Sequence, residues 1–249
     1  RLRWSALNND AQWTVRKNSA DFQDFPDGGE IMGHATFDRG AIIFQATCIR
    51  EMIPAYDSPA IFNFIKTEEE RGCVAPGSIV QSGRAVFFLS RDGWYQYWQP
   101  SIPIGKNRVD EWFLRNHDPA ALHLIQGIDD PDRKIIYWRF KSTSHVNAHS
   151  TDKILVYNYG VDRWAVIDQP LTLLAPFGTG GTTLDALDAL LGLPLDSITT
   201  SLDSSSWQGG RRVLSGFDAQ FRLGFFSGET MEATITAADV EFNPMRRSF

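Results

Sequence analysis

The strongest constraint on the fold is a succession of short apolar or aromatic runs separated by turn residues. In VFFLSRDGWYQYW, residues 86–98, the dipeptide Asp92-Gly93 joins two runs of strand-forming residues. Asp-Gly between two such runs is among the strongest hairpin signals in a sequence. A second hairpin is predicted in DKILVYNYGVDRWAVID, residues 152–168, with its turn at residues 158–162. The pattern therefore predicts an all-β fold.

The same order of strand, turn, apolar strand and aromatic hairpin recurs along the chain. Aligning residues 86–89 with residues 135–138 gives a spacing of 49 residues, close to the roughly 40 to 50 residues of a four-stranded propeller blade. A further hairpin is predicted over residues 41–53, and a weaker copy over residues 212–236. We therefore predict a β-propeller-like array of short antiparallel sheets. A β-sandwich built from similar hairpins is the alternative.

One segment departs from this pattern. In GTGGTTLDALDALLGLP, residues 178–194, the leucines at 184, 187, 190 and 191 would share one face of a helix, so we predict one short helical insertion. The expected organisation is propeller blades over residues 1–170, a loop and short-helix insertion over 171–210, and a further β blade or the start of a following β domain over 211–249. Both ends are expected to continue into a longer chain.

Composition and charge exclude several classes of protein. A net charge of −6 argues against a dispersed basic surface that grips nucleic acid by neutralising its phosphates. Two cysteines, Cys48 and Cys73, cannot form the disulfide framework of a small secreted scaffold, and we expect both to be reduced, buried thiols. No apolar run approaches the roughly 20 residues of a membrane-spanning helix.

No residue is predicted to be catalytic, cofactor-binding or metal-binding. The glycine-rich residues 178–183 lack the lysine of a phosphate-binding loop. His145 and His149 lie in a polar stretch without a third ligand nearby, which favours a solvated loop. Residues 129–132 favour a tight turn over a calcium site, and residues 68–70 favour a solvated face over an acid–base pair. We therefore expect a protein that is not an enzyme.

Four aromatic residues, Trp94, Tyr95, Tyr97 and Trp98, alternate along one predicted strand. Successive side chains of a strand point to opposite faces, so some of these rings must point outward or into a neighbouring sheet. Packing inside the blades is the favoured interpretation. An intersubunit surface or a carbohydrate-binding surface is the alternative, since exposed aromatic residues serve both.

Several strings, in their order along the chain, carry a resemblance to a known family. They are RLRWSALNNDAQW, DFQDFPDGG, IIFQATCIREM, ERGCVAPGSIVQSGRAVFFLSRDGWYQYW, IPIGKNRVDEWF, DDPDRKIIYWRF and ILVYNYGVDRWAVID. Together they resemble tailed-phage and prophage proteins similar to the packaged-DNA stabilisation, head-closure or nozzle (tail hub) proteins of short-tailed phages. The resemblance covers residues 1–168 and the remainder more loosely.

The resemblance implies a structural subunit, with no catalytic residues and no cofactor, in the virion tail, assembled in the host cytoplasm. Such subunits contain a β-propeller and form a ring, usually a hexamer, below the portal and adaptor. The expected partners are copies of itself, adaptor and portal proteins, tail needle or fibre proteins, and genomic DNA that passes without sequence-specific binding; no membrane is expected. A carbohydrate-binding tail adhesin that recognises a host surface is the alternative function, and a glycan-cleaving enzyme the third.

Overall fold

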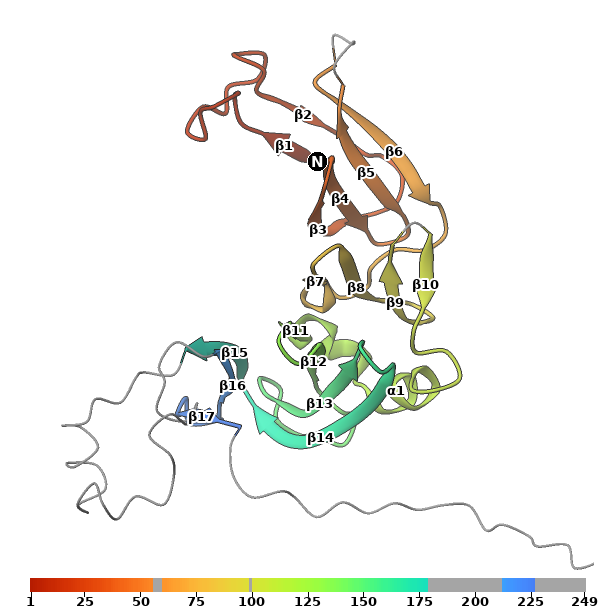
Figure 1. Cartoon of the computed structure of the whole chain (residues 1–249), viewed down its shortest axis with the longest axis vertical. Coiled ribbons are helices and arrows are strands. Elements are labelled where there is room, and N and C mark those ends of the chain that lie inside the picture. The colour runs from red at the N-terminus through yellow and green to blue at the C-terminus, as the bar shows by residue number, and fades with distance from the viewer. Residues whose placement is uncertain (56–59, 99, 179–211, 227–249) are drawn as a thin grey trace, which may run out of the picture.

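The computed structural model describes residues 1–55, 60–98, 100–178 and 212–226. In these residues the strands form five antiparallel sheets, of which three have four strands, one has three and one has two. The sheets follow one another along a curve in chain order (Figure 1). No helix in the described ranges is long and apolar enough to cross a membrane.

The strands of each sheet follow one another in the chain. The N-terminal pair contains β1 (Leu2–Trp4) and β2 (Asp21–Gln23); the first sheet contains β3 (Ile31–Phe37), β4 (Gly40–Gln45), β5 (Ile49–Pro54) and β6 (Phe62–Glu68). The second contains β7 (Val80–Ser82), β8 (Ala85–Ser90), β9 (Gly93–Tyr97) and β10 (Ser101–Pro103); the third contains β11 (Gln126–Asp130), β12 (Ile135–Phe140), β13 (Thr151–Asn158) and β14 (Arg163–Leu171). The fourth contains β15 (Leu173–Gly178), β16 (Arg212–Phe217) and β17 (Leu223–Phe225).

Each four-stranded sheet is a meander of consecutive strands, and the first strands of successive sheets lie together. β11 contacts β7 on one side and β15 on the other. Separate apolar clusters join the first sheet to the second, the second to the third, and the third to the fourth. A β-sandwich has two sheets around one core, so the stacked arrangement confirms the β-propeller-like array.

Strand β8 explains why the run VFFL contains no polar residue. Phe88 belongs to the cluster shared with the first sheet, whereas Phe87 and Leu89 belong to the cluster shared with the third. A strand that is buried on both faces carries apolar residues at every position. The third sheet supplies Trp138, whose ring centroid lies 4.3 Å from that of Trp94 in β9.

The structural repeat is 50 residues between the second and third sheets, rather than 49. Val86 packs toward the preceding sheet, and so does Ile136, while β8 and β12 begin at Ala85 and Ile135. Side chains alternate with a period of two, so a shift of one residue exchanges the two faces of a strand. The spacing of 49 was therefore wrong by one residue because the apolar strings alone carry no information on which face is which.

Two local predictions also change. Residues 129 and 130 are the end of β11, and the turn lies at residues 131–134, where Lys134 has φ +59°. Residues 173–178, expected in a loop, form β15 because they pair along their whole length with β16. The helix expected over residues 184–191 lies outside the described residues.

Three short helices occur in the described connections: η1 (Pro76–Ser78), α1 (Asp110–Asn116) and η2 (Pro119–Leu124). The sequence pattern did not predict α1, because seven residues give too little apolar periodicity and its N-terminus lacks a side-chain cap. Phe113 of α1 is fully buried between the rings of Trp94 and Phe140. The helix therefore closes one end of the core between the second and third sheets.

Glutamine side chains join the first strands of neighbouring sheets. On β7, Gln81 donates to the carbonyl of Thr36 (2.8 Å) and accepts from its amide (3.1 Å). On β11, Gln126 donates to the carbonyl of Leu174 (2.9 Å) and accepts from its amide (3.2 Å). Each glutamine side-chain amide thus donates to and accepts from one backbone residue of the neighbouring sheet, as a residue of a paired strand would. We call these two contacts the glutamine clips.

The clip at Gln126 also holds a buried cation. Arg139 is buried, and its Nε donates to the side-chain oxygen of Gln126 at 2.7 Å. No carboxylate in the described part of the chain forms an ion pair with Arg139, and its Nη1 has no hydrogen-bond partner there. Burial lowers the pKa of this guanidinium. The Gln126 oxygen is therefore the principal group that offsets the desolvation of Arg139.

Candidate functional site

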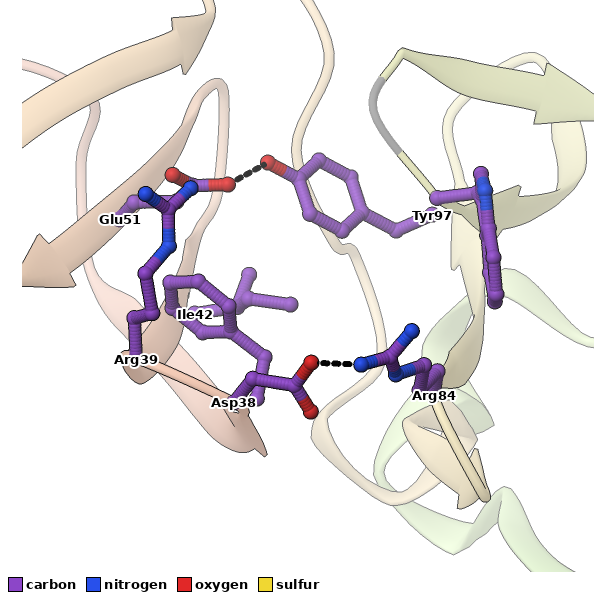
Figure 2. Close-up of a pocket in the computed structure, with 8 residues that line it drawn as sticks. Asp38, Arg39, Ile42, Glu51, Arg84 and Tyr97 are labelled. Carbon is purple, nitrogen blue, oxygen red and sulfur yellow. Dashed lines mark hydrogen bonds and ion pairs between the residues drawn. The ribbon is translucent and has the colours of Figure 1, made fainter.

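A pocket of about 230 Å³ lies between the first and second sheets (Figure 2). Its walls come from the β3–β4 turn, strands β4 and β5, the β7–β8 turn and the end of β9. The lining residues are Phe37, Asp38, Arg39, Ile42, Glu51, Arg84, Tyr97 and Trp98. The stacking of two consecutive sheets therefore creates the pocket, and neither sheet forms it alone.

A buried hydrogen-bonded pair crosses the inner end of the pocket. The Tyr97 hydroxyl donates to Oε1 of Glu51 at 3.0 Å and lies 2.9 Å from the hydroxyl of Thr67. Figure 2 shows Glu51 on the first sheet and Tyr97 on the second facing one another. Burial, the largest cause, raises the pKa of Tyr97 far above its ordinary value. The phenol therefore stays protonated and holds the carboxylate of Glu51 in a fixed position.

An exposed ion pair closes the pocket at the turns. Asp38 in the β3–β4 turn pairs with Arg84 in the β7–β8 turn, as Figure 2 shows. Both side chains are more than half exposed, and an exposed pair of this kind stabilises a fold by no more than about 1 kcal/mol. Arg39, the residue after Asp38, also lines the pocket. The pair's main effect is thus to position two charged groups beside the pocket.

The lining combines balanced charge with apolar surface. Two acidic residues and two arginines line the pocket, so their formal charges cancel. Ile42 is buried and Phe37 is half-buried beneath them. Trp98, the residue after β9, is 52% exposed. The arrangement offers hydrogen-bond donors, acceptors and an aromatic ring together without a net charge.

The four alternating aromatic residues divide as the strand geometry predicts. Trp94 lies in the core with the third sheet, and Tyr95 and Tyr97 lie in the core with the first. Trp98 remains exposed. Packing inside the array therefore accounts for three of the four rings, and Trp98 is the ring that needs another explanation.

The predicted hairpin at residues 152–168 consists of β13 and β14, the outer two strands of the third sheet. Tyr157 is buried there, with Tyr159 and Trp164 packed against the same core. Asp162 in the turn has φ +54°, and it accepts a hydrogen bond from the Tyr157 hydroxyl at 3.0 Å. The hairpin is thus a packing element of a repeated sheet.

The other residues considered from the sequence lie apart from the pocket. In the described ranges no group of three His, Cys, Asp or Glu could hold a metal ion. His145 contacts Ser150 at 2.8 Å, and both His145 and His149 lie in the loop before β13. Cys48 and Cys73 are free and buried, as predicted.

Glu68 corrects one expectation. Glu69 and Glu70 are exposed, but Glu68 ends β6 and is partly buried. It accepts a hydrogen bond from the backbone amide of Ser101 at 2.9 Å and pairs with Arg71 at 3.5 Å. Because Ser101 begins β10, this contact joins the outer strands of the first and second sheets, which a local sequence pattern cannot indicate.

Sequence reasoning did not single out Asp38, Arg39, Glu51 or Arg84. They lie on two turns and one strand that are up to 46 residues apart. One sequence feature pointed to the turn residues: Asp38-Arg39 and Gly83-Arg84 occupy equivalent turns of two repeats. A correct register between the repeats would have placed both turns at the same end of the array.

The chain matches no protein-family model, and no curated protein matches it.

Proposed function

We propose that this chain is a structural subunit of a phage tail, part of a nozzle, hub or head-closure ring that continues the DNA channel below the portal and adaptor. It acts by assembly and helps to retain and deliver the genome. The ring is expected to be hexameric and to contact adaptor or portal proteins and tail needle or fibre proteins. The resemblance of residues 1–168 to the proteins of short-tailed phages motivates this proposal.

The observation that carries the proposal is the apolar outer face of the fourth sheet. Leu174 and Leu214 pack against the third sheet, so the alternate residues of the strands point the other way. Four large apolar residues on that opposite face are between 36% and 48% exposed: Leu173, Phe177, Leu223 and Phe225.

On this face the described part of the fourth sheet presents aromatic and aliphatic side chains to solvent. An exposed apolar patch of this kind marks an interaction surface. A neighbouring subunit of a ring would cover such a face, so the patch supports a subunit that acts by assembly.

The charge of the chain is compatible with a channel wall. With a net charge of −6, a lumen that carried the acidic excess would repel the DNA backbone and let the genome pass. We propose such a lumen; a neutral or basic channel wall in the assembled ring would exclude it.

The assembly is tested by measuring the molar mass of the purified chain by light scattering over a range of concentrations, with electron microscopy of the resulting particles. We expect a ring that binds portal or adaptor proteins. Phe225→Asp should shift the mass toward the monomer, because it places a charge on the apolar face. Val161→Asp, in the exposed β13–β14 turn, is the matched control and should leave the ring intact. A monomer at every concentration, alone and with the adaptor, would contradict the proposal.

A further inference from the structure

We propose that the pocket between the first and second sheets binds a single neutral sugar ring. The inference rests on the pocket alone and does not depend on the assembly of the fourth sheet. Its volume of about 230 Å³ is below the roughly 300 to 1,000 Å³ of pockets that take drug-sized molecules. The space therefore suits one ring better than an extended chain, a nucleotide or a peptide.

The charges of the lining favour a neutral ligand. Asp38 and Glu51 oppose Arg39 and Arg84, so an added phosphate or carboxylate would meet two carboxylates as well as two guanidinium groups. A sugar hydroxyl both donates and accepts, and so it can bond a carboxylate and a guanidinium at once. This property matches a pocket in which both kinds of group converge without a net charge.

The exposed indole supplies the apolar part of such a contact. Trp98 is 52% exposed and lines the pocket. An indole presents an apolar, electron-rich face, against which the C–H groups of a pyranose ring can pack while its hydroxyls face the polar groups. An apolar ligand would leave those polar groups unpaired, which is costly.

Three of the four charged groups are already held in place. Tyr97 fixes the carboxylate of Glu51, and Asp38 and Arg84 hold one another across the two turns. Little side-chain freedom would then be lost on binding, which favours affinity. The residues come from two sheets, and the apolar cluster that joins these sheets, in which the ring centroids of Phe44 and Phe88 lie 5.0 Å apart, fixes their separation.

The test is ligand-observed NMR, by saturation transfer, with the methyl glycosides of glucose, galactose, mannose and N-acetylglucosamine as probes. We expect at least one of them to bind with a Kd on the order of 1 mM. Glucuronic acid and methyl phosphate, both of which carry C–H protons that the method observes, are the charged comparisons and should give no signal.

Variants locate the binding to the pocket. Trp98→Ala should weaken binding at least about tenfold, because it removes the stacking surface. Glu51→Gln keeps an oxygen for Tyr97 but removes the charge, and it should weaken binding more moderately. Trp13→Ala removes a tryptophan that is 47% exposed in the β1–β2 connection, and it should bind as the unaltered chain does.

Circular dichroism of each variant establishes that it is folded before its binding is compared. Absence of signal from all four neutral glycosides at 10 mM would overturn the proposal, as would binding that survives both Trp98→Ala and Glu51→Gln. Preferential binding of glucuronic acid or methyl phosphate would overturn the neutral class of ligand.

Discussion

The glutamine clip at Gln126 allows the energetic role of one side chain to be worked out from its contacts. Replacing it by leucine, Gln126→Leu, keeps a similar volume and removes three hydrogen bonds: two to the backbone of Leu174 and one from the buried Arg139. A neutral hydrogen bond contributes about 1 kcal/mol, and one to a charged group about 1.5 to 3 kcal/mol. We therefore expect the free energy of unfolding to fall by about 3 to 5 kcal/mol.

Two further variants separate hydrogen bonding from packing. Gln81→Leu removes the equivalent clip on β7, but Gln81 is exposed and holds no cation, so the loss should be about 1 kcal/mol. Gln126→Glu keeps both acceptor roles and places a negative charge beside Arg139, while it loses the donor to the Leu174 carbonyl. It should therefore be more stable than Gln126→Leu at neutral pH, although it buries a further charge.

The assay is urea unfolding of each variant, combined with hydrogen exchange of the Leu174 amide, which the clip protects. Gln126→Leu should speed that exchange strongly, and Gln81→Leu should leave it unchanged. The reasoning is refuted if Gln126→Leu and Gln81→Leu lower the free energy of unfolding equally, or if Gln126→Leu is more stable than Gln126→Glu. Either result would mean that the clip does not offset the desolvation of the Arg139 charge.

Three further predictions follow from other contacts. Burial raises the pKa of Asp110, so its contribution to stability is present below the unfolded pKa of about 3.9 and is lost as the pH rises. In urea unfolding, Asp110→Asn should therefore gain stability relative to the native chain between pH 4 and pH 7. A difference in the free energy of unfolding between the two chains that does not change with pH would contradict this. A Cβ at Gly77 would lie 2.0 Å from the Ile125 carbonyl oxygen, so Gly77→Ala should lower the free energy of unfolding by about 3 kcal/mol or more in thermal unfolding. Gly178→Ala, where no atom of the described residues lies within 4 Å of the added Cβ, should lower it little. Burial raises the pKa of the Cys48 and Cys73 thiols, so both should react with Ellman's reagent only after unfolding, and rapid reaction of the native chain would show that one is accessible.

Local patterns predicted the strands better than the connections between them. The hairpin of β8 and β9, whose turn lies one residue earlier at Arg91–Asp92, and the hairpin at residues 152–168 were recognised because turn chemistry and strand propensity agree over a few residues. The end of β11 was not, because Asp129 and Asp130 are common turn residues and Pro131 marks irregular structure without fixing where the strand ends. The repeat itself was recognised, but its register required knowledge of which sheet each side chain faces.

The candidate pocket could not have been predicted, for a different reason. Glu51 lies within a strand that reads as ordinary scaffold, and its role depends on Tyr97 in another sheet. Arg84 and Asp38 look like common turn residues until the two turns meet. Long-range juxtaposition of this kind is set by the stacking of whole sheets, so a single sequence, without the register of its repeats, does not contain a local signal for it.

The pairing of β15 with β16 has a consequence for the order in which the molecule is made. In the first three sheets each strand pairs with its immediate neighbours in sequence, so each sheet can close soon after its last strand has been synthesised. β15 must wait until Arg212 and the residues after it have left the ribosome. During that interval the third sheet's face beside Leu171 has no fourth sheet to cover it, and a nascent chain is then most open to aggregation or to chaperone binding.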